Sequence, residues 1–215
     1  MKEKIGKVFS IAEDNPMIDG LTISKQVYGG ANQMTYFSLG KDTDISPELY
    51  SYYKLLIVAE GSLEIYGVSS KYLKTAESIL TGTGQALGMR TNEGAIYTEI
   101  VIGKEDIMNE NIKAGEVFKL KDLVPYQEDK IVNMDLVKND KMKFVVMAFD
   151  EGTALSEHAA PGEALVFALD GQAVINYEGK DNLIKAGENF HFAKSGRHSI
   201  KATKKFKMAL FLTLD

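Results

Sequence analysis

The 215-residue sequence predicts an all-β protein made of two tandem jelly-roll β-barrels. Two observations predict this fold class. Short runs rich in β-branched and aromatic residues alternate with Gly-rich turns at spacings of about ten residues, and no segment keeps a helical apolar period over more than about three turns. The chain also repeats itself at an offset of about 110 residues. Short, evenly spaced strands are typical of closed or double-sheet β architectures.

The internal repeat sets the domain organisation. Residues 6–9 (GKVF) resemble residues 115–118 (GEVF), residues 59–65 resemble residues 169–175, and residues 74–77 resemble residues 185–188. The offset drifts by single residues at turns, because loops absorb insertions more readily than strands do. We therefore expect two domains, residues 1–105 and residues 106–215.

Each copy contains about eight short strand signals. Single helical turns could form at residues 11–15 and 107–112. In the first copy the expected strands are residues 21–27, 34–39, 52–59, 62–66, 72–75, 78–80 and 95–102. In the second copy they are residues 130–137, 141–149, 164–169, 172–177, 182–185, 189–193, 198–202 and 206–214.

Residues 152–171 (GTALSEHAAPGEALVFALDG) are the most informative stretch. They read as a turn-rich loop carrying His158, a bend at Pro161, a short apolar strand, and a tight turn at Asp170 and Gly171 that leads into a second strand. This order predicts an imidazole at the mouth of a strand pair.

Composition narrows the function. The chain is 45% hydrophobic, has no cysteine and lacks any apolar run long enough to cross a bilayer, so we expect a cytoplasmic protein without thiolate metal ligands. Its formal charge of −5 and pI near 5.4 argue against a nucleic-acid partner.

The second copy resembles a cupin. The family's two glycine-bounded motifs align in register with this half of the chain, and through the repeat they align weakly with the first half. The aligned positions are Gly152, His158, Ala160, Gly171, Gly187, Ala193, Ser195 and His198. The resemblance implies RmlC-like jelly-roll barrels, and it implies a homodimer.

In metal-binding cupins the resemblance implies a divalent cation (Fe, Mn, Ni or Zn) held by three histidines and a glutamate. Only His158 and His198 remain here, because Ala160 and Ala164 occupy the other two positions. Glu163 lies one residue early, so it faces the opposite side of a regular strand unless the bend re-aims it. His158 and His198 are the candidate metal ligands; a hydrogen-bonded pair without metal is the alternative.

His191 is the third and last histidine of the chain. Strand alternation places it on one face, with Phe190 and Phe192 on the other, without deciding which face is inside. It is either part of the pocket or a surface or interface histidine. The predicted ligand-binding residues are His158, Glu163, His191 and His198, with aromatic walls from Phe167, Tyr177 and Phe190.

The first copy has no histidine at the motif positions, which are Glu48, Tyr50, Lys54 and Leu87. We therefore expect no metal site there. Its tyrosines at positions 50, 52 and 53 could line a small-molecule pocket or serve packing or a subunit interface.

These observations favour a protein that binds a small polar molecule in the second barrel, with a structural first barrel. One alternative is a metal-dependent dioxygenase or isomerase that uses His158 and His198. Another is a structural or interaction module. The sequence leaves open whether the protein is an enzyme.

Overall fold

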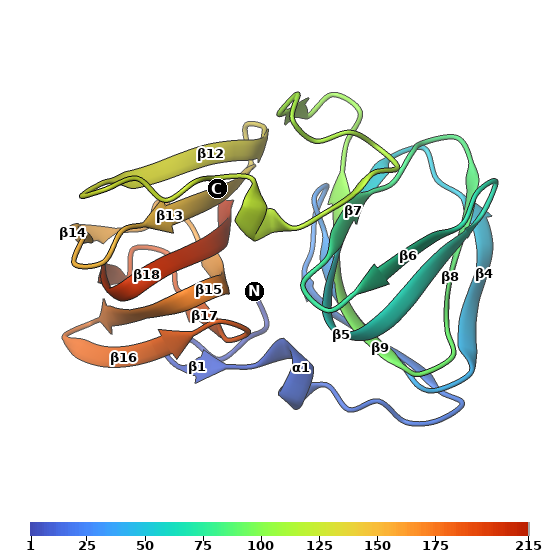
Figure 1. Cartoon of the computed structure of the whole chain (residues 1–215), viewed down its shortest axis with the longest axis horizontal. Helices are drawn as coiled ribbons and strands as arrows, with labels where there is room; N and C mark the ends of the chain where they lie inside the picture. Colours follow the sequence, from blue (N-terminus) through green and yellow to red (C-terminus); the bar gives the residue numbers. More distant parts are fainter. Residues whose placement is uncertain (215) are drawn as a thin grey trace. The chain divides into compact units, whose positions relative to one another are not determined.

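The computed structural model describes residues 1–214 of the chain. Across these residues the strands form two nine-stranded sheets, which confirms the all-β, two-barrel fold. The chain divides into two compact units (Figure 1), which are described separately below. No helix in this described part is long and apolar enough to cross a membrane.

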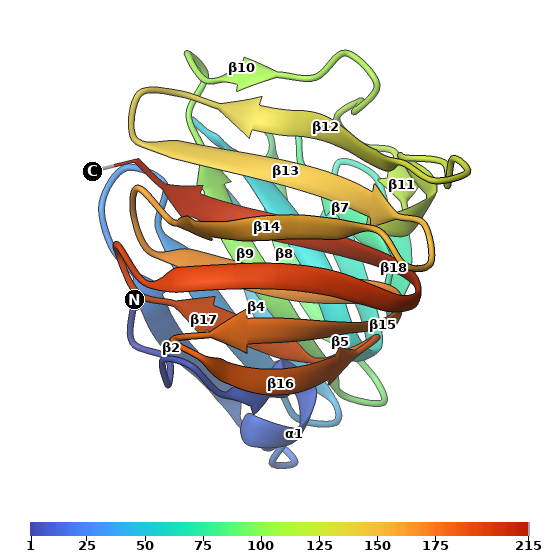
Figure 2. The ribbon, with the colours of Figure 1, turned by 90° about the vertical axis from the view of Figure 1, so that its left-hand side faces the viewer.

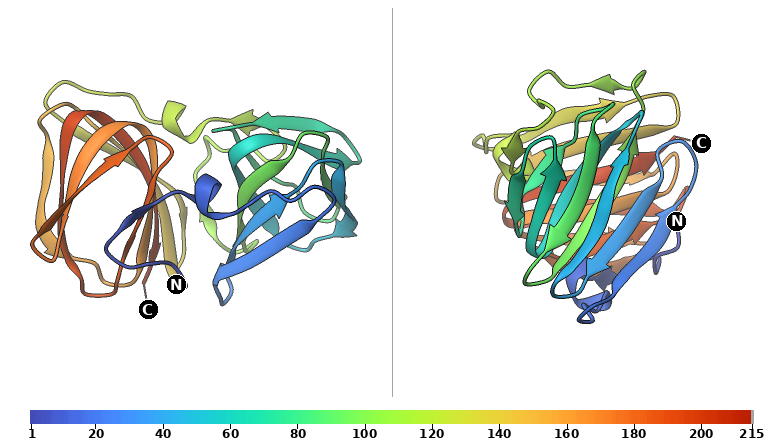
Figure 3. Two further views of the ribbon diagram at one scale, coloured as in Figure 1. Left: turned by 90° about the horizontal axis from the view of Figure 1, so that it is seen from below. Right: turned by 90° about the vertical axis from the view of Figure 1, so that its right-hand side faces the viewer.

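The first unit comprises residues Met1–Lys2, Ile11–Asp106 and Glu110–Lys119. Its sheet runs in the order β11-β7-β5-β9-β3-β2, with β4, β6 and β8 joined to it through β5 and β8. Seen from below in Figure 3, its strands curl around an interior. Its elements are α1 (Ile11–Asp14), β2 (Thr22–Tyr28), β3 (Met34–Leu39), β4 (Thr43–Leu49), β5 (Tyr53–Gly67), β6 (Lys71–Lys74), β7 (Ser78–Leu80), β8 (Ala86–Thr91), β9 (Ala95–Ile102) and β11 (Val117–Phe118).

The second unit comprises residues Glu3–Ser10, Ile107–Asn109 and the chain from Leu120 onward. Its sheet runs in the order β1-β17-β15-β18-β13-β12-β10, with β14 on β18 and β16 on β15 (Figure 2). Its elements are β1 (Val8–Phe9), β10 (Ile107–Met108), the 3-10 turn η1 (Leu120–Asp122), β12 (Ile131–Lys138), β13 (Met142–Phe149), β14 (Ala154–Ala159), β15 (Ala164–Tyr177), β16 (Lys180–Lys185), β17 (Asn189–Phe192) and β18 (Arg197–Thr213).

Two short strands are exchanged between the repeats. β1 pairs with β17, so that Val8 lies opposite Phe190, and the equivalent strand of the second copy, β11, pairs with β7, so that Val117 lies opposite Ile79. The sequence predicted a single division after residue 105, and the compact units differ from it by these exchanged segments. Pairing across such distances leaves no local signal in the sequence.

The tight turn expected at Asp170 and Gly171 does not form. β15 continues through both residues, and its register with β18 shifts there as in a β-bulge. Gly171 has a φ of 69°, and a Cβ at this position would collide with the carbonyl oxygen of Lys205. A glycine is therefore needed for the close approach of two strands, where the sequence suggested a chain reversal.

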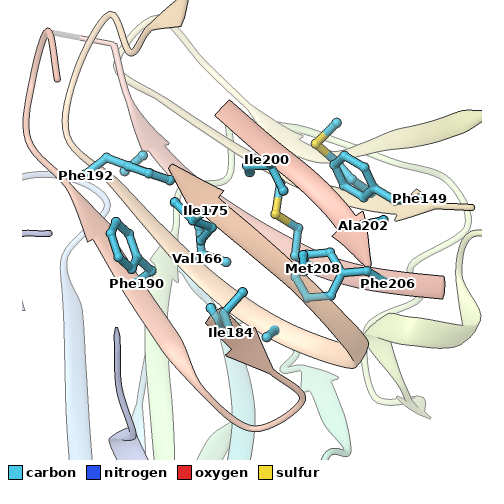
Figure 4. Close-up of a cluster of buried hydrophobic side chains, with 14 of the residues drawn as sticks. Phe149, Val166, Ile175, Ile184, Phe190, Phe192, Ile200, Ala202, Phe206 and Met208 are labelled. Atoms are coloured by element: carbon cyan, nitrogen blue, oxygen red, sulfur yellow. The ribbon is translucent and has the colours of Figure 1, made fainter. Parts of the chain in front are cut away.

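The core of the second unit lies inside the curled sheet. Alternate residues of β15, such as Ala164, Val166 and Ala168, point into a cluster that also contains Phe190 and Phe192 of β17. Figure 4 shows side chains of this cluster, among them Met208 and Ile200 from β18. Residues on the inner face of these strands therefore decide what space the barrel encloses.

Candidate ligand-binding site

His158 and His198 face each other across two strands of the second unit. The region expected as a loop forms strand β14, which pairs with β18 so that the two histidines are direct cross-strand partners. Their ring centroids are 4.3 Å apart, with an angle of 55° between the ring planes. Directly opposed residues of an antiparallel pair share one face of the sheet, so both rings point to the same side.

The two rings differ in burial. His158 is exposed at the rim, whereas His198 is 5% exposed and stacks on Phe192 with 4.0 Å between ring centroids. Burial lowers the pKa of His198 below its ordinary value, and the neighbouring His158 lowers it further, although the Gly196 carbonyl opposes the shift. His198 is therefore held toward its neutral form.

Both histidines line a cavity of about 210 Å³ inside the second barrel. Its walls are mainly apolar, and Asn133 and Lys143 are the other polar residues that line it. Figure 4 labels three of the wall residues, Phe192, Ile200 and Met208. The remaining wall residues are Val145, Met147, Leu155, Ala160, Pro161, Ala164, Leu210 and Leu212.

His191 and Glu163 do not line this cavity. Because Phe190 and Phe192 face the barrel interior, alternation turns His191 to the opposite face of β17. There its Nδ1 donates to the Glu3 carbonyl at 3.0 Å, and its Nε2 lies 3.4 Å from the Glu163 carboxylate. Burial lowers the pKa of His191. The two residues thus form a pair beside residues 3–10.

The predicted aromatic walls also lie away from the cavity lining. Phe167 is on the opposite face of β15 from Val166 and packs edge-to-face on Phe144 at 6.3 Å. Tyr177 packs against Phe190 at 5.8 Å, at the end of the apolar cluster. The aromatic residue that does line the cavity is Phe192, which sequence reasoning missed because alternation alone does not show which face of β17 is inside.

The cavity has too few coordinating side chains to bind a divalent cation tightly. Ala160 and Ala164 line it at the two motif positions that have lost a ligand, and Glu163 is turned toward His191. Within residues 1–214 there is no group of three histidine, cysteine or carboxylate side chains arranged to hold a metal ion. Two imidazoles fall short of the three protein ligands that a catalytic zinc usually has.

The first unit fills the equivalent position with an ion pair. Lys54 stands where the second unit has Ala164, and its Nζ lies 3.1 Å from Glu99 Oε2. The side chains of Lys54 and Glu99 are 6% and 7% exposed, and Nζ lies 3.5 Å from the centroid of the Tyr50 ring. Burial raises the pKa of Glu99, and the Lys54 ammonium opposes that shift. Sequence reasoning missed this pair, although a glutamate within an apolar strand could have indicated it.

No protein-family model matches the sequence, and no curated protein does. Solved structures match it well. The chain is similar to a Cupin 2 conserved barrel domain protein from Leptotrichia buccalis, with 25% identity over 99% of this chain and 98% of that one, and a TM-score of 0.86.

Two further structures share the fold at lower identity. They are salicylate 1,2-dioxygenase from Pseudaminobacter salicylatoxidans (11% identity, 85% of this chain, 70% of that one, TM-score 0.60) and Ylba from E. coli (10% identity, 98% and 92%, TM-score 0.60). The fold of both units agrees with these likenesses. The chain is a two-barrel member of the cupin superfamily in which the metal-binding motif has degenerated.

Proposed function

We propose that this protein binds a small molecule in the cavity of its second barrel, and that the first barrel serves a structural role. The observation that carries the proposal is the pair of imidazoles, 4.3 Å apart, at the side of an apolar cavity of about 210 Å³. Concave, mainly apolar pockets with a few convergent polar groups are typical ligand sites. The equivalent inward positions of the first barrel carry the Lys54–Glu99 pair instead.

Binding is tested by titration calorimetry with a panel of sugars, organic acids and phenolics. We expect saturable binding of at least one class. Ala164→Leu adds bulk to the cavity wall and should weaken that binding at least about tenfold, because a few lost contacts and about 1.4 kcal/mol suffice for such a change. Ala159→Leu is the matched control, since Ala159 is exposed and does not line the cavity.

If no compound of the panel binds, or if both leucine variants behave alike, the binding proposal is wrong. A structural or interaction module, the remaining alternative from the sequence, would then be the better explanation.

The alternative of a metal-dependent dioxygenase or isomerase rests on one observation, the cross-strand pairing of His158 with His198. Metal analysis of protein purified without chelators separates the two functions. A bound equivalent of Fe, Mn, Ni or Zn that disappears in His158→Ala would favour the enzyme. Less than about a tenth of an equivalent, unchanged by the substitution, would leave ligand binding alone.

A further inference from the structure

We infer that the ligand of the second barrel is an uncharged, mainly apolar molecule of one six-membered ring, bound through a hydroxyl or N–H group that donates a hydrogen bond to the paired histidines. This inference rests on the proposed function and sharpens it. It separates the site from one for sugars, which carry many hydroxyls, and from one for carboxylates, which carry a charge.

The hydrogen bonds of both histidines determine where their protons lie. His158 Nδ1 is 2.9 Å from the Ser156 carbonyl oxygen, and His198 Nδ1 is 3.0 Å from the Gly196 carbonyl oxygen. A carbonyl oxygen only accepts, so each Nδ1 carries the proton. In a neutral imidazole the other nitrogen, Nε2, then has a lone pair and accepts hydrogen bonds. In their neutral form, the two imidazoles that line the cavity therefore each carry one acceptor, Nε2.

Charges around the pair do not favour an anion. Lys143 is the one lysine or arginine among the cavity-lining residues, and its Nζ lies 2.7 Å from Asp135 Oδ1, so its charge is already neutralised. Beside the histidines, Arg197 is paired with Glu157, and its backbone N–H donates to Glu178. A carboxylate in the cavity would thus be repelled by the lone pairs on Nε2 of His158 and His198, and no unpaired lysine or arginine among the lining residues would offset this repulsion.

The walls limit both the size and the polarity of the ligand. The cavity measures about 210 Å³. In another protein, an engineered apolar cavity of about 150 Å³ binds benzene, so this one has room for one ring with one or two small substituents. Burying a hydroxyl against side chains such as Met208, Leu210 and Ile200 without a hydrogen-bond partner is unfavourable. A sugar would lose binding free energy in this way for each of its several hydroxyl groups.

Three ring compounds of similar shape test the inference. p-Cresol carries a hydroxyl donor, 4-methylanisole has the same ring without a donor, and p-toluate is an anion. At pH 8 a phenol remains protonated, since its hydroxyl titrates near pH 10. We expect p-cresol to bind about fivefold more tightly than either of the others by calorimetry, because one net hydrogen bond contributes about 1 kcal/mol, which corresponds to that ratio.

Two variants identify the acceptor. His198→Phe keeps a ring against Phe192 but removes one of the two acceptors, so the preference for p-cresol over 4-methylanisole should fall while 4-methylanisole still binds. His158→Phe tests the second acceptor at an exposed position, where folding is not at risk. Ala159→Leu again serves as the control that leaves the preference unchanged.

Binding of p-toluate or 4-methylanisole as tightly as p-cresol at pH 8, or binding of sugars alone, would overturn the inference and leave the proposed function standing. Absence of binding by every compound would overturn both.

Discussion

The two barrels pair their strands in the same register, but the side chains that point into their interiors differ in polarity. In the first barrel Glu99 lies opposite Leu56 and Tyr97 opposite Val58; in the second, Leu210 lies opposite Val166 and Met208 opposite Ala168. The four residues Glu99, Tyr97, Leu210 and Met208 thus occupy equivalent inward positions of the two copies.

The side chains at these positions decide the difference. The first barrel carries a buried ion pair and a stacked aromatic pair, Phe37 on Tyr97 with 5.1 Å between ring centroids. The second carries flexible or branched apolar side chains and keeps a cavity between them. Strand register can therefore be retained while the inward residues change from an ion pair and stacked rings to apolar side chains around a cavity.

The largest expected effect comes from breaking the ion pair of the first barrel. Lys54→Met leaves the Glu99 carboxylate buried without its cation, which should lower the free energy of unfolding by about 3–5 kcal/mol at pH 7. The double variant Lys54→Met/Glu99→Leu should recover most of that loss, because apolar residues of similar volume often replace a buried pair at little cost. Urea denaturation measures both.

An equal loss in the single and the double variant would show that the pair contributes packing alone. The charges of Lys54 and Glu99 would then add no stability to the first barrel.

The next largest effect concerns a glycine that both barrels have at the same place in the repeat. Gly61 of β5 and Gly171 of β15 both have positive φ, and a Cβ at either would collide with a backbone carbonyl oxygen across the sheet. Each alanine substitution should therefore cost at least about 1–3 kcal/mol. Gly187→Ala is the control, because Gly187 also has positive φ but its Cβ would meet nothing within 4 Å.

Thermal denaturation of the three glycine variants checks this prediction. A cost at Gly171 no greater than that at Gly187 would mean that the strands separate easily there, and that Gly171 is not needed for their close approach.

The smallest effect is a pH response of opposite sign in the two units. Burial lowers the pKa of His198, so the stability it contributes is present above its ordinary pKa of 6.5 and is lost as the pH falls through the lower folded value. Burial raises the pKa of Glu99, so the first unit should gain stability as the pH falls toward 4.5. Hydrogen exchange followed residue by residue separates the units.

His198→Phe should reduce the acid sensitivity of the second unit, and His191→Phe should reduce the remainder, since burial lowers the pKa of His191 as well. Equal acid sensitivity of both units would contradict the assignment of opposite signs.

Much of this architecture follows from sequence alone. Alternating apolar residues and Gly-rich turns predict strands, and the repeated GKVF and GEVF segments predict two copies of one unit. The resemblance to the cupin motifs indicates His158 and His198 together, and in the structure they are cross-strand partners. The strands themselves follow from local periodicity, because it depends only on neighbouring residues.

Tertiary structure decided the rest. Asp170 and Gly171 suit a tight turn or a bulge equally well, and only the presence of β18 beside them selects the bulge. The direction of His191 depends on which face of β17 is buried, and the partners of Lys54 and of residues 8–9 lie far away in the chain. The sequence determined which residues form strands, whereas the pairing of those strands determined which side chains share an interior, because side-chain facing is a property of the closed sheet.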